Sequence, residues 1–534
     1  MSRLLLVVVV FTLVLTVGCA GFNVFEATIG DIQNAFALGE LSSCVELAGL
    51  YGARIDAYED DLRSLVHRNP RVQRDAEVLD TMSSEERAAL PLWCIPFVSK
   101  DNIDKSRDEF GMPTTAGSDT LRENFAKENA VLLQRMLDAG ALLLGSANMA
   151  TFATDGSNTN SSVRGQTRNT FDPRRTPMGS SGGTATAVSA SLCAIGLGSD
   201  TNGSIQNPAN VQSLAGLRPT VGLVPTGGTF PLFDLQDTFG PIGRSVRDLA
   251  LLMNVLDNGR PPKTLIAPHH SYPTEPVAGS LQGVRVGLLN DTIFPFPDLP
   301  TGGGLAGAQA TDPGARSAVL TIADEMTRLG AEVVVLEDVA QRVMGIVTAD
   351  FLPSLPCNNA EEIGSWNYYL GHMVTADSPA HNVSQLYDLI AANPNETPGI
   401  AEAMVSANQS ANYPYAAVYQ PSCEAYSFLR QTIIRTLEGE LLDHNLDVFL
   451  YAPMRGPASI LGESIPFTFS TIAAVSGNPA LVIPAGVTDT THPPMPVGAT
   501  LLATRFQEAR LLQWGMELEA NYPHRQIPSF SPPL

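Results

Sequence analysis

The sequence has few basic residues. Its 534 residues include 32 Lys and Arg against 54 Asp and Glu, which gives a formal net charge of -22. Binding to nucleic acid or to an anionic membrane surface needs a basic footprint, which this chain lacks. We therefore expect neither partner and interpret the charge as the acidic surface of a soluble protein.

The sequence also lacks the motifs that hold metals and phosphates. It contains no CxxC, no HExxH and no cluster of His, Cys and acidic residues at metal-ligand spacing. No Lys follows its glycine-rich stretch as a phosphate-binding P-loop requires. We therefore expect no metal and no cofactor.

No apolar run is long enough to span a bilayer comfortably, which takes about 20 residues. The run at 4–17 follows Arg3 and is followed by Gly18, Cys19 and Ala20. This is the pattern of a secretory signal peptide over residues 1–20, cleaved after Ala20. It predicts a secreted or lumenal protein without a stable membrane span. A lipid anchor on Cys19 is a minor alternative.

Cysteines are too sparse for a disulfide framework, and removal of residues 1–20 leaves an odd number of them. One or two bridges remain open, and Cys193, in an apolar stretch, is expected to be a buried thiol. Asn-x-Ser/Thr sequences fit a secreted glycoprotein and are also near the number that chance allows. The other cysteines are Cys44, Cys94, Cys357 and Cys423, and the asparagines of such sequences include Asn160, Asn290, Asn382, Asn395 and Asn408.

Charge is scarcest in the segment 176–218, where Asp200 is the only charged residue before Arg218. Such a segment must be buried, yet it is rich in Ser, Thr, Asn and Gly. Those polar groups cost free energy inside a protein unless they are hydrogen-bonded. Two serines lie beside glycine, Ser180 in GSSGG and Ser204 in TNGS, with a small-residue helix or strand pair between them. We interpret the segment as a catalytic core.

No histidine lies between Lys100 and Asp248. This weakens a Ser-His-Asp triad without excluding it, because triad members can be distant in sequence. The motif at 179–183 also matches GxSxG, the nucleophile elbow of α/β-hydrolase esterases, with Ser181 as nucleophile. The histidine of that alternative would be His269, His372 or His381.

A serine without a histidine needs another base. Lysine can serve if burial lowers its pKa from about 10.4 towards neutrality. Lys100 is the candidate, because it ends a short apolar strand within 90–104. Burial statistics alone favour instead a salt bridge between Lys100 and Asp101 or Asp104.

Helix-to-strand steps along the chain predict an α/β layered fold. A helix at 129–140 precedes a strand at 141–145, and a strand at 283–289 precedes a helix at 315–329 and a strand at 331–336. Thr28 and Asp31 form a capping-box-like start of the first helix. The other expected elements are helices at 28–51, 52–66 and 506–518, strands at 446–453 and 479–484, and a surface loop at 297–314.

The chain contains PFVSKDNID with Lys100, GSSGG at 179–183, and GSDTNGSIQNPA with Ser204, followed by GLRPTVGLVP. These motifs resemble the amidase signature family. GMPTTAGS, AGALLLGSANM, RGQTRN, QDTFGPIGRSVRD and GNPALVIPAG continue the similarity in the family's order. It covers most of 28–520 and is weakest over 260–440. The resemblance implies one α/β/α domain over 21–534, built around a twisted mixed sheet, with the signature core at about 90–260.

The resemblance also implies a Ser-cisSer-Lys triad. By motif position, Ser204 is the nucleophile, Ser180 is the bridging serine after a cis peptide, and Lys100 is the base. Ser180 also contacts the substrate, a small-molecule amide. The expected oxyanion hole consists of the backbone N–H groups of Thr201, Asn202, Gly203 and Ser204.

Two residues beside the nucleophile depart from the family pattern. Asn202 stands where the family usually has Gly, or Asp in peptide-amidase-like members, and Gln206 stands where it often has Arg. We expect Gln206 to contact the substrate, and these two amides would not select a charged one. The RGQT and QDT sequences resemble peptide amidases, which remove a C-terminal amide. The glutamyl-tRNA amidotransferase subunit of the same family fits a secreted, acidic chain badly.

We therefore expect a secreted serine amidohydrolase that cleaves the carbon–nitrogen bond of a linear amide through an acyl-enzyme on Ser204. One alternative is a catalytically silent amide-binding protein of the same fold, which Asn202 and Gln206 would allow. The other is an α/β-hydrolase esterase that uses Ser181.

Overall fold

A computed structural model describes residues 22–257, 271–293, 311–397 and 415–534, without the side chains of 348–362 and 415–422. The predicted signal peptide with Cys19 lies outside these residues, as do most of the predicted loop at 297–314 and His269, His270 and Asn408. Within the described ranges, no helix is long and apolar enough to cross a membrane.

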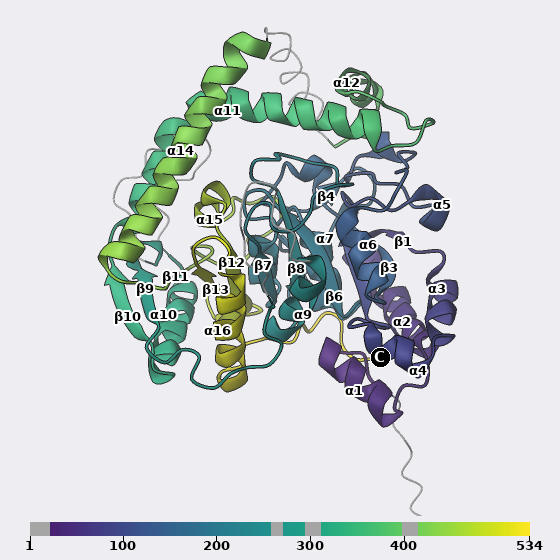
Figure 1. Ribbon diagram of the computed structural model, residues 1–534, viewed down its shortest axis with the longest axis horizontal. Coiled ribbons are helices and arrows are strands. Elements are labelled where there is room, and N and C mark those ends of the chain that lie inside the picture. The colour runs from purple at the N-terminus through teal and green to yellow at the C-terminus, as the bar shows by residue number, and fades with distance from the viewer. Residues whose placement is uncertain (1–21, 258–270, 294–310, 398–414) are drawn as a thin grey trace, which may run out of the picture.

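One mixed sheet of eleven strands forms the centre of the described molecule (Figure 1). In sheet order its strands are β1 (Leu65–Arg68), β3 (Leu142–Ala147), β2 (Pro96–Lys100), β6 (Ile195–Asp200), β8 (Thr238–Gly243), β7 (Ala215–Arg218), β12 (Ala480–Thr488), β13 (Met495–Leu502), β11 (Val448–Tyr451), β9 (Arg285–Leu289) and β10 (Glu332–Leu336). Parallel pairs join β2 to β3 and β6, and β9 to β10 and β11, while the pairs between β6 and β11 are antiparallel. The predicted α/β class with a mixed sheet is confirmed.

Helices cover both faces of this sheet. They are α1 (Ile29–Leu38), α2 (Cys44–Leu62), α3 (Val72–Asp80), α4 (Ser84–Ala89), α5 (Arg107–Phe110), α6 (Val131–Asp138), α7 (Gly182–Ser189), α8 (Gln206–Val211), α9 (Val246–Leu256), α10 (Pro313–Arg328), α11 (Val339–His372), α12 (Val383–Ala392), α14 (Tyr415–Asp443), α15 (Thr471–Ser476) and α16 (Glu508–Asn521). Short 3₁₀ turns are η1 (Asp119–Leu121), η2 (Thr151–Ala153) and η3 (Asn290–Thr292), and a separate strand pair is β4 (Asn160–Ser161) with β5 (Gly165–Gln166).

Neighbouring residues of β6 show which helices cover each face of the sheet. A Cβ on Gly196 would lie 2.4 Å from Thr184 of α7. Gly243, which pairs with Ile195, lies instead against Leu249 of α9. Because successive strand residues point to opposite faces, α7 and α9 cover opposite faces of the sheet.

The register also places Lys100 on the α7 face. Val98, two residues before Lys100, pairs with Gly196. Gly216 of β7 packs against α8 and, like Gly196, pairs with Ile242. Paired residues share a face, so Lys100 and the helices α7 and α8 lie on the same side of the sheet.

The N-terminal helices differ from the prediction. The capping box of Thr28 and Asp31 is present, but α1 ends at Gly39, which is left-handed with φ 75°. A new helix, α2, starts after the N-cap Ser43 and runs without a break past residue 52. The expected boundary between residues 51 and 52 is therefore wrong, because Gly39 and the Ser43 cap set the boundary.

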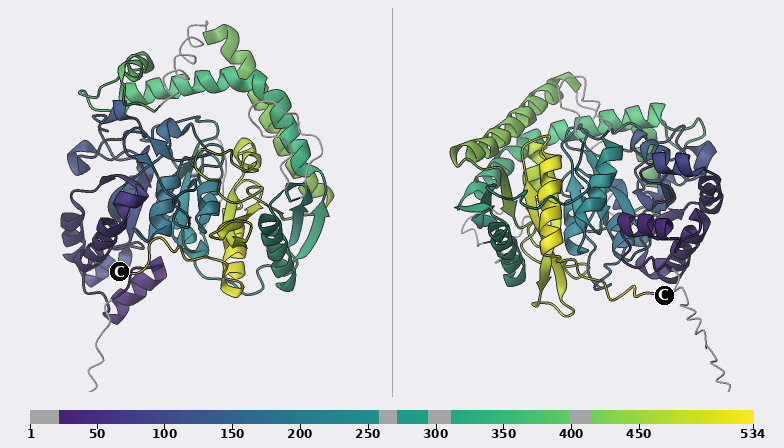
Figure 2. Two further views of the ribbon diagram at one scale, coloured as in Figure 1. Left: turned by 180° about the vertical axis from the view of Figure 1, so that it is seen from behind. Right: turned by 60° about the horizontal axis from the view of Figure 1, so that its bottom comes forward.

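The other expected elements are present within a few residues of their predicted bounds, as α6, β3, β9, α10, β10, β11, β12 and α16. No pattern in the sequence predicted the two long helices α11 and α14. They pack against each other and arch over one end of the sheet, as both views show (Figures 1 and 2).

A disulfide joins Cys44, at the start of α2, to Cys94, just before β2. Cys423 is also disulfide-bonded. Cys193 is a free, buried thiol, as expected from its apolar surroundings. Burial raises the pKa of this thiol to about 12, so it stays protonated.

Candidate active site

The Ser180 segment runs where the backbone leaves no room for side chains. A Cβ on Gly179 would lie 2.0 Å from the carbonyl oxygen of Asn158, and one on Gly183 would lie 2.2 Å from that of Asn148. Glycine is therefore required at both positions. The Gly179–Ser180 peptide is cis, and Ser180 is fully buried at the entrance to α7.

Most other hydroxyls of this segment have structural partners. Thr184 donates to the Leu197 carbonyl at 3.3 Å, Thr186 to that of Arg168 at 3.0 Å, and Ser189 to that of Gln212 at 3.1 Å. These bonds satisfy polar groups in a helix that is buried on all sides. Hydroxyl-rich composition alone therefore does not identify the reactive serine.

Lys100 lies between two serine hydroxyls. Its Nζ is 2.7 Å from Ser180 Oγ and 2.7 Å from Ser199 Oγ, and the side chain is completely buried. Ser199 in turn accepts a hydrogen bond of 3.3 Å from Asn102 Nδ2. No sequence signal singled out Ser199.

The expected salt bridge of Lys100 with Asp101 or Asp104 is wrong. Asp101 accepts hydrogen bonds from the Thr115 hydroxyl and from the Gly117 N–H. Asp104 accepts one of 2.6 Å from the Tyr369 hydroxyl. Other donors therefore hold both carboxylates, and Lys100 points away from them towards the serines.

Burial lowers the pKa of Lys100 to about 7, because desolvation disfavours the charged amine. The carboxylates of Asp237 and Asp200 act in the opposite sense and limit this fall. At neutral pH, a substantial fraction of Lys100 is therefore neutral. The neutral amine is the form that can accept a proton from Ser180.

Ser204 lies just before α8 and is 4% exposed. Its carbonyl accepts a hydrogen bond of 3.3 Å from the Ser181 N–H, which ties the two serine segments together. Between these described residues, no hydrogen bond joins the hydroxyls of Ser180 and Ser204. The first contact of the expected relay is thus present and the second is not formed.

The N–H groups around Ser204 are not equivalent. Gly203 donates its N–H to Asp200 Oδ1 at 2.8 Å, which corrects the expectation that it is free to receive an oxyanion. Within the described part of the chain, Thr201, Asn202 and Ser204 have no acceptor for theirs. Gly203 has φ 99°, and a Cβ there would lie 2.2 Å from Ser470 Oγ, so only glycine fits.

Asp200 holds the loop that carries Ser204. Its carboxylate accepts the N–H groups of Gly203 and Ile205 and forms a fully buried ion pair of 2.6 Å with Arg218. Burial tends to raise the pKa of Asp200, but the Arg218 charge and these N–H groups lower it overall. The scarcity of charge in this segment is the sequence signal that could have predicted the Asp200–Arg218 ion pair. A lone charge in an apolar segment needs a partner, and Arg218 is the next charged residue along the chain.

Gln206 supports the loop that carries Ser204. It is fully buried, and its Nε2 donates to Asp200 Oδ2 at 3.3 Å. Its contact with a substrate stays a prediction. Asn202, in contrast, is exposed beside Ser204. The departure from the family pattern at Asn202 thus changes the exposed surface beside Ser204. The departure at Gln206 changes the buried hydrogen bonds of Asp200, which holds the Ser204 loop.

Ser181 is not placed as a nucleophile elbow. It is fully buried, donates its hydroxyl to the Ser199 carbonyl at 2.9 Å and accepts the Ser199 N–H at 3.2 Å. No histidine within the described ranges bonds to it. His372 contacts the Tyr368 carbonyl instead, and His524 contacts Glu325.

In the described residues, one group of side chains has metal-ligand proximity, namely Cys44, Asp80 and Cys94. The two sulfurs are joined in the disulfide, and the Asp80 carboxylate accepts the N–H groups of Cys44 and Val45 at the start of α2. The group is therefore a structural one.

A protein-family model described as Amidase matches residues 46–512. The chain belongs to the amidase family. The predicted resemblance is thereby confirmed, and this amidase is an enzyme of a family that hydrolyses or transfers amide carbon–nitrogen bonds.

Curated relatives and solved structures agree on the family. A glutamyl-tRNA(Gln) amidotransferase subunit of Deinococcus radiodurans is 30% identical over 504 residues, which cover 92% of this chain and 97% of the relative. The crystal structure of peptide amidase from Stenotrophomonas maltophilia has a TM-score of 0.78 at 28% identity and covers 95% of this chain and 99% of its own. For 6-aminohexanoate cyclic dimer hydrolase, at 22% identity, 95% and 99% coverage and a TM-score of 0.72, the likeness shows the fold alone.

Proposed function

We propose that this amidase is a serine hydrolase of linear amides, with Ser204 as nucleophile and Ser180 and Lys100 as proton relay. The observation that carries the proposal is the 2.7 Å contact between Ser180 Oγ and the amine of fully buried Lys100. A neutral amine that is hydrogen-bonded to a buried serine hydroxyl can act as a general base. A catalytically silent amide-binding protein does not need such a base.

In the acylation step, neutral Lys100 accepts the proton of Ser180, and Ser180 accepts that of Ser204. The Ser204 oxygen forms a bond to the amide carbonyl carbon, and the carbonyl oxygen becomes an oxyanion. The unpaired N–H groups of Thr201, Asn202 and Ser204 supply its hydrogen bonds, each worth about 3 to 4 kcal/mol in such sites. Substrate binding has to bring the two serine hydroxyls together, as catalytic hydrogen bonds often tighten only then.

Collapse of the tetrahedral intermediate breaks the carbon–nitrogen bond. The proton held on Lys100 returns through Ser180 to the leaving nitrogen, which departs as an amine or as ammonia. Water then attacks the ester on Ser204 with the same relay as base, which releases a carboxylic acid and restores both serines.

Among amidases, we favour a peptide-amidase-like substrate, a C-terminal carboxamide. The 28% identity to peptide amidase over 95% of this chain supports it. Asn202, which stands in place of the Asp of peptide-amidase-like members, is exposed beside the nucleophile and presents a neutral amide to the substrate end.

The second candidate is an amidotransferase, which the names of the curated relatives favour. The net charge of -22 opposes a tRNA partner, because binding a polyanion needs a basic surface. The test supplies the purified protein with an amide donor and glutamyl-tRNA(Gln). Release of free ammonia without tRNA supports the hydrolase, whereas tRNA-dependent transfer of the amide nitrogen supports the second candidate.

The nucleophile is tested with two serine variants and a panel of amino-acid amides, peptide amides and simple esters. Ser204→Ala is expected to abolish turnover of every substrate. Ser181→Ala should fold and keep measurable activity, since its hydroxyl bonds to the backbone of β6. An active Ser204→Ala and an inactive, folded Ser181→Ala would refute the assignment.

We also propose that residues 1–20 direct secretion and that residues 21–534 form a single domain. Disulfides persist in oxidising compartments, so the Cys44–Cys94 bridge supports an extracellular or lumenal protein. Asn160 is exposed and suits glycosylation, whereas Asn290, Asn382 and Asn395 use their side chains in hydrogen bonds. Mass spectrometry of the secreted chain should find Gly21 as its first residue, and retention of Cys19 with a lipid would favour the anchor.

A further inference from the structure

The two helices that follow the serines are short and end in the same buried region. Helix α7 spans 8 residues and begins two residues after Ser180, while α8 spans 6 residues and begins two residues after Ser204. Each helix leaves unpaired carbonyl groups at its far end, which carry partial negative charge. Three arginines from other parts of the chain donate to carbonyls at these ends or just past them.

Arg54 of α2 holds the end of α7. It is 2% exposed, and it donates to the carbonyls of Ala190 and Ser191 at 2.7 and 3.0 Å. The same guanidinium donates to the carbonyls of Ser531 and Pro532 at 2.9 and 3.0 Å. One side chain that donates four hydrogen bonds therefore joins α7 to the C-terminal segment.

Arg244, between β8 and α9, holds the same helix end. It is 3% exposed and donates to the carbonyls of Val188 and Cys193 at 2.7 and 2.9 Å, and also to that of Ala27. Within the described ranges, neither Arg54 nor Arg244 has a carboxylate at ion-pair distance. Both charges are thus directed at carbonyl groups at the end of a helix, where a cation is favourable.

Arg525 holds the end of α8. It lies in the segment 522–534, which we call the strap and which runs from α16 to the side of α1 and α2 (Figures 1 and 2). It donates to the carbonyl of Ser213, two residues past α8, at 2.5 Å and pairs with Glu26 at 2.6 Å. Glu26 in turn accepts from the Ser191 hydroxyl at 3.4 Å, which links the ends of α8 and α7.

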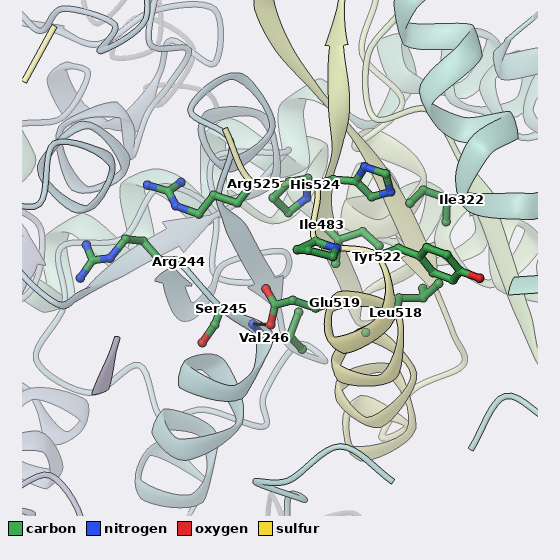
Figure 3. A pocket seen from close by; sticks show the side chains of 13 residues that line it. Arg244, Ser245, Val246, Ile322, Ile483, Leu518, Glu519, Tyr522, His524 and Arg525 are labelled. Atoms are coloured by element: carbon green, nitrogen blue, oxygen red, sulfur yellow. Dashed lines mark hydrogen bonds between the residues drawn. The ribbon is translucent and has the colours of Figure 1, made fainter. Parts of the chain in front are cut away.

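Figure 3 shows Arg244 and Arg525 on one side of a cavity of about 230 Å³ between α16 and the strap. Both guanidiniums extend away from the cavity (Figure 3), and their carbonyl partners Val188 and Ser213 lie at the end of α7 and just past α8. The strap adds a further link, since the Phe530 N–H donates to the Thr170 carbonyl at 3.4 Å and Thr170 Oγ1 lies 2.9 Å from Ser189 Oγ at the end of α7.

We propose that Arg54, Arg244 and Arg525 form an arginine clamp that positions the serine relay. The clamp fixes the carbonyl ends of α7 and α8 relative to each other, and the helices transmit this placement to Ser180 and Ser204 at their opposite ends. This inference rests on the proposed function of the two serines. Its physical basis is that a misplacement of about 1 Å can cost about a hundredfold in rate, even from a change far from the reacting atoms.

The experiment measures how fast a fluorophosphonate reagent labels the protein at 25 °C. Labelling forms a bond from Ser204 Oγ to phosphorus and expels fluoride, while the serine proton passes through Ser180 to Lys100, so the rate reports the relay without an amide substrate. In Arg54→Lys the charge stays, but one ammonium cannot reproduce the fork that reaches four carbonyls. Arg68→Lys is the matched control, because Arg68 is 51% exposed and pairs at the surface with Asp56.

We expect labelling of folded Arg54→Lys to slow by about tenfold or more, with the pH midpoint of wild type. Arg68→Lys should label at the wild-type rate. If the arginines only stabilise the fold, Arg54→Lys will melt at a lower temperature but label like wild type at 25 °C, and the inference is overturned. Arg525→Lys repeats the measurement from the α8 end and decides the question if Arg54→Lys does not fold.

The controls separate this inference from the proposed function. Labelling of Ser204→Ala at the wild-type rate, or absence of labelling in wild type, would count against Ser204 as nucleophile. Normal labelling of Arg54→Lys and Arg525→Lys, with no labelling of Ser204→Ala, would refute the clamp alone.

Discussion

Two completely buried lysines, Lys100 and Lys105, lie five positions apart on one segment and have different surroundings. The Lys100 amine touches two serine hydroxyls at 2.7 Å. The Lys105 amine has no hydrogen-bond partner among the described residues, although Asp101 and Asp104 act on its charge. Burial lowers the pKa of Lys100 to about 7 and that of Lys105 to about 8.

A lowered pKa therefore does not by itself identify a catalytic base. Both lysines are neutral in part near physiological pH, because both have lost the hydration of their charge. Only Lys100 is bonded to a serine that belongs to the proposed relay. What distinguishes the two is the hydroxyl that can pass on a proton.

The largest expected effect separates the two lysines directly. Lys100→Ala should lower kcat by more than about a thousandfold, as losses of relay members do, while circular dichroism shows an intact fold. Lys105→Ala should keep most of the activity, since its amine contacts no hydroxyl of the relay. A folded, active Lys100→Ala protein would show that Lys100 is not the base and would remove the basis of the comparison.

The next effect concerns Ser180, through which Lys100 is proposed to act. Ser180→Ala should cost orders of magnitude in kcat. The double variant Ser180→Ala, Lys100→Ala should be scarcely worse than the poorer single variant, because residues that act as a unit are not additive. If the two losses multiply instead, Lys100 does not act through Ser180.

The pH dependence sharpens the comparison further. Because the neutral amine is the active form, kcat/KM should rise on a single limb with a midpoint near pH 7 and level off above it. The Asp237 carboxylate favours the charged amine, so Asp237→Asn should shift the midpoint to lower pH. Asp489→Asn, at an exposed acid, is the control. An unchanged or raised midpoint in Asp237→Asn would show that another group controls the limb.

The smallest expected effect is on stability and belongs to Lys105. Its folded pKa of about 8 lies below the unfolded value of about 10.4. Between these values the unfolded chain binds more protons, so stability should increase with pH across this window. The rise in Tm from pH 8 to pH 10 should be smaller in Lys105→Met than in wild type. Equal rises would mean that the Lys105 amine is solvated in the folded protein.

Local patterns predicted part of the fold. Turn chemistry and apolar periodicity placed α6, β3, β9, α10 and β10 within a few residues. They failed at α2, because a glycine inside a stable helix and a glycine that ends one look alike in sequence. Gly52 lies within the helix and Gly39 ends one, and only the left-handed conformation of Gly39 distinguishes them.

The sequence by itself determined the residues of the candidate site, because the resemblance of its motifs to the amidase signature family implied the roles of Lys100, Ser180 and Ser204 without a structure. The tertiary structure decided their surroundings. It brought Ser199 into contact with Lys100, Gln206 into contact with Asp200, and the arginines to the ends of α7 and α8. The hydrogen-bonded partners are 6 to 478 positions apart in the sequence. The physical reason is that sheet register and buried charge pairing, which bring distant segments to one face, leave no local pattern in the chain.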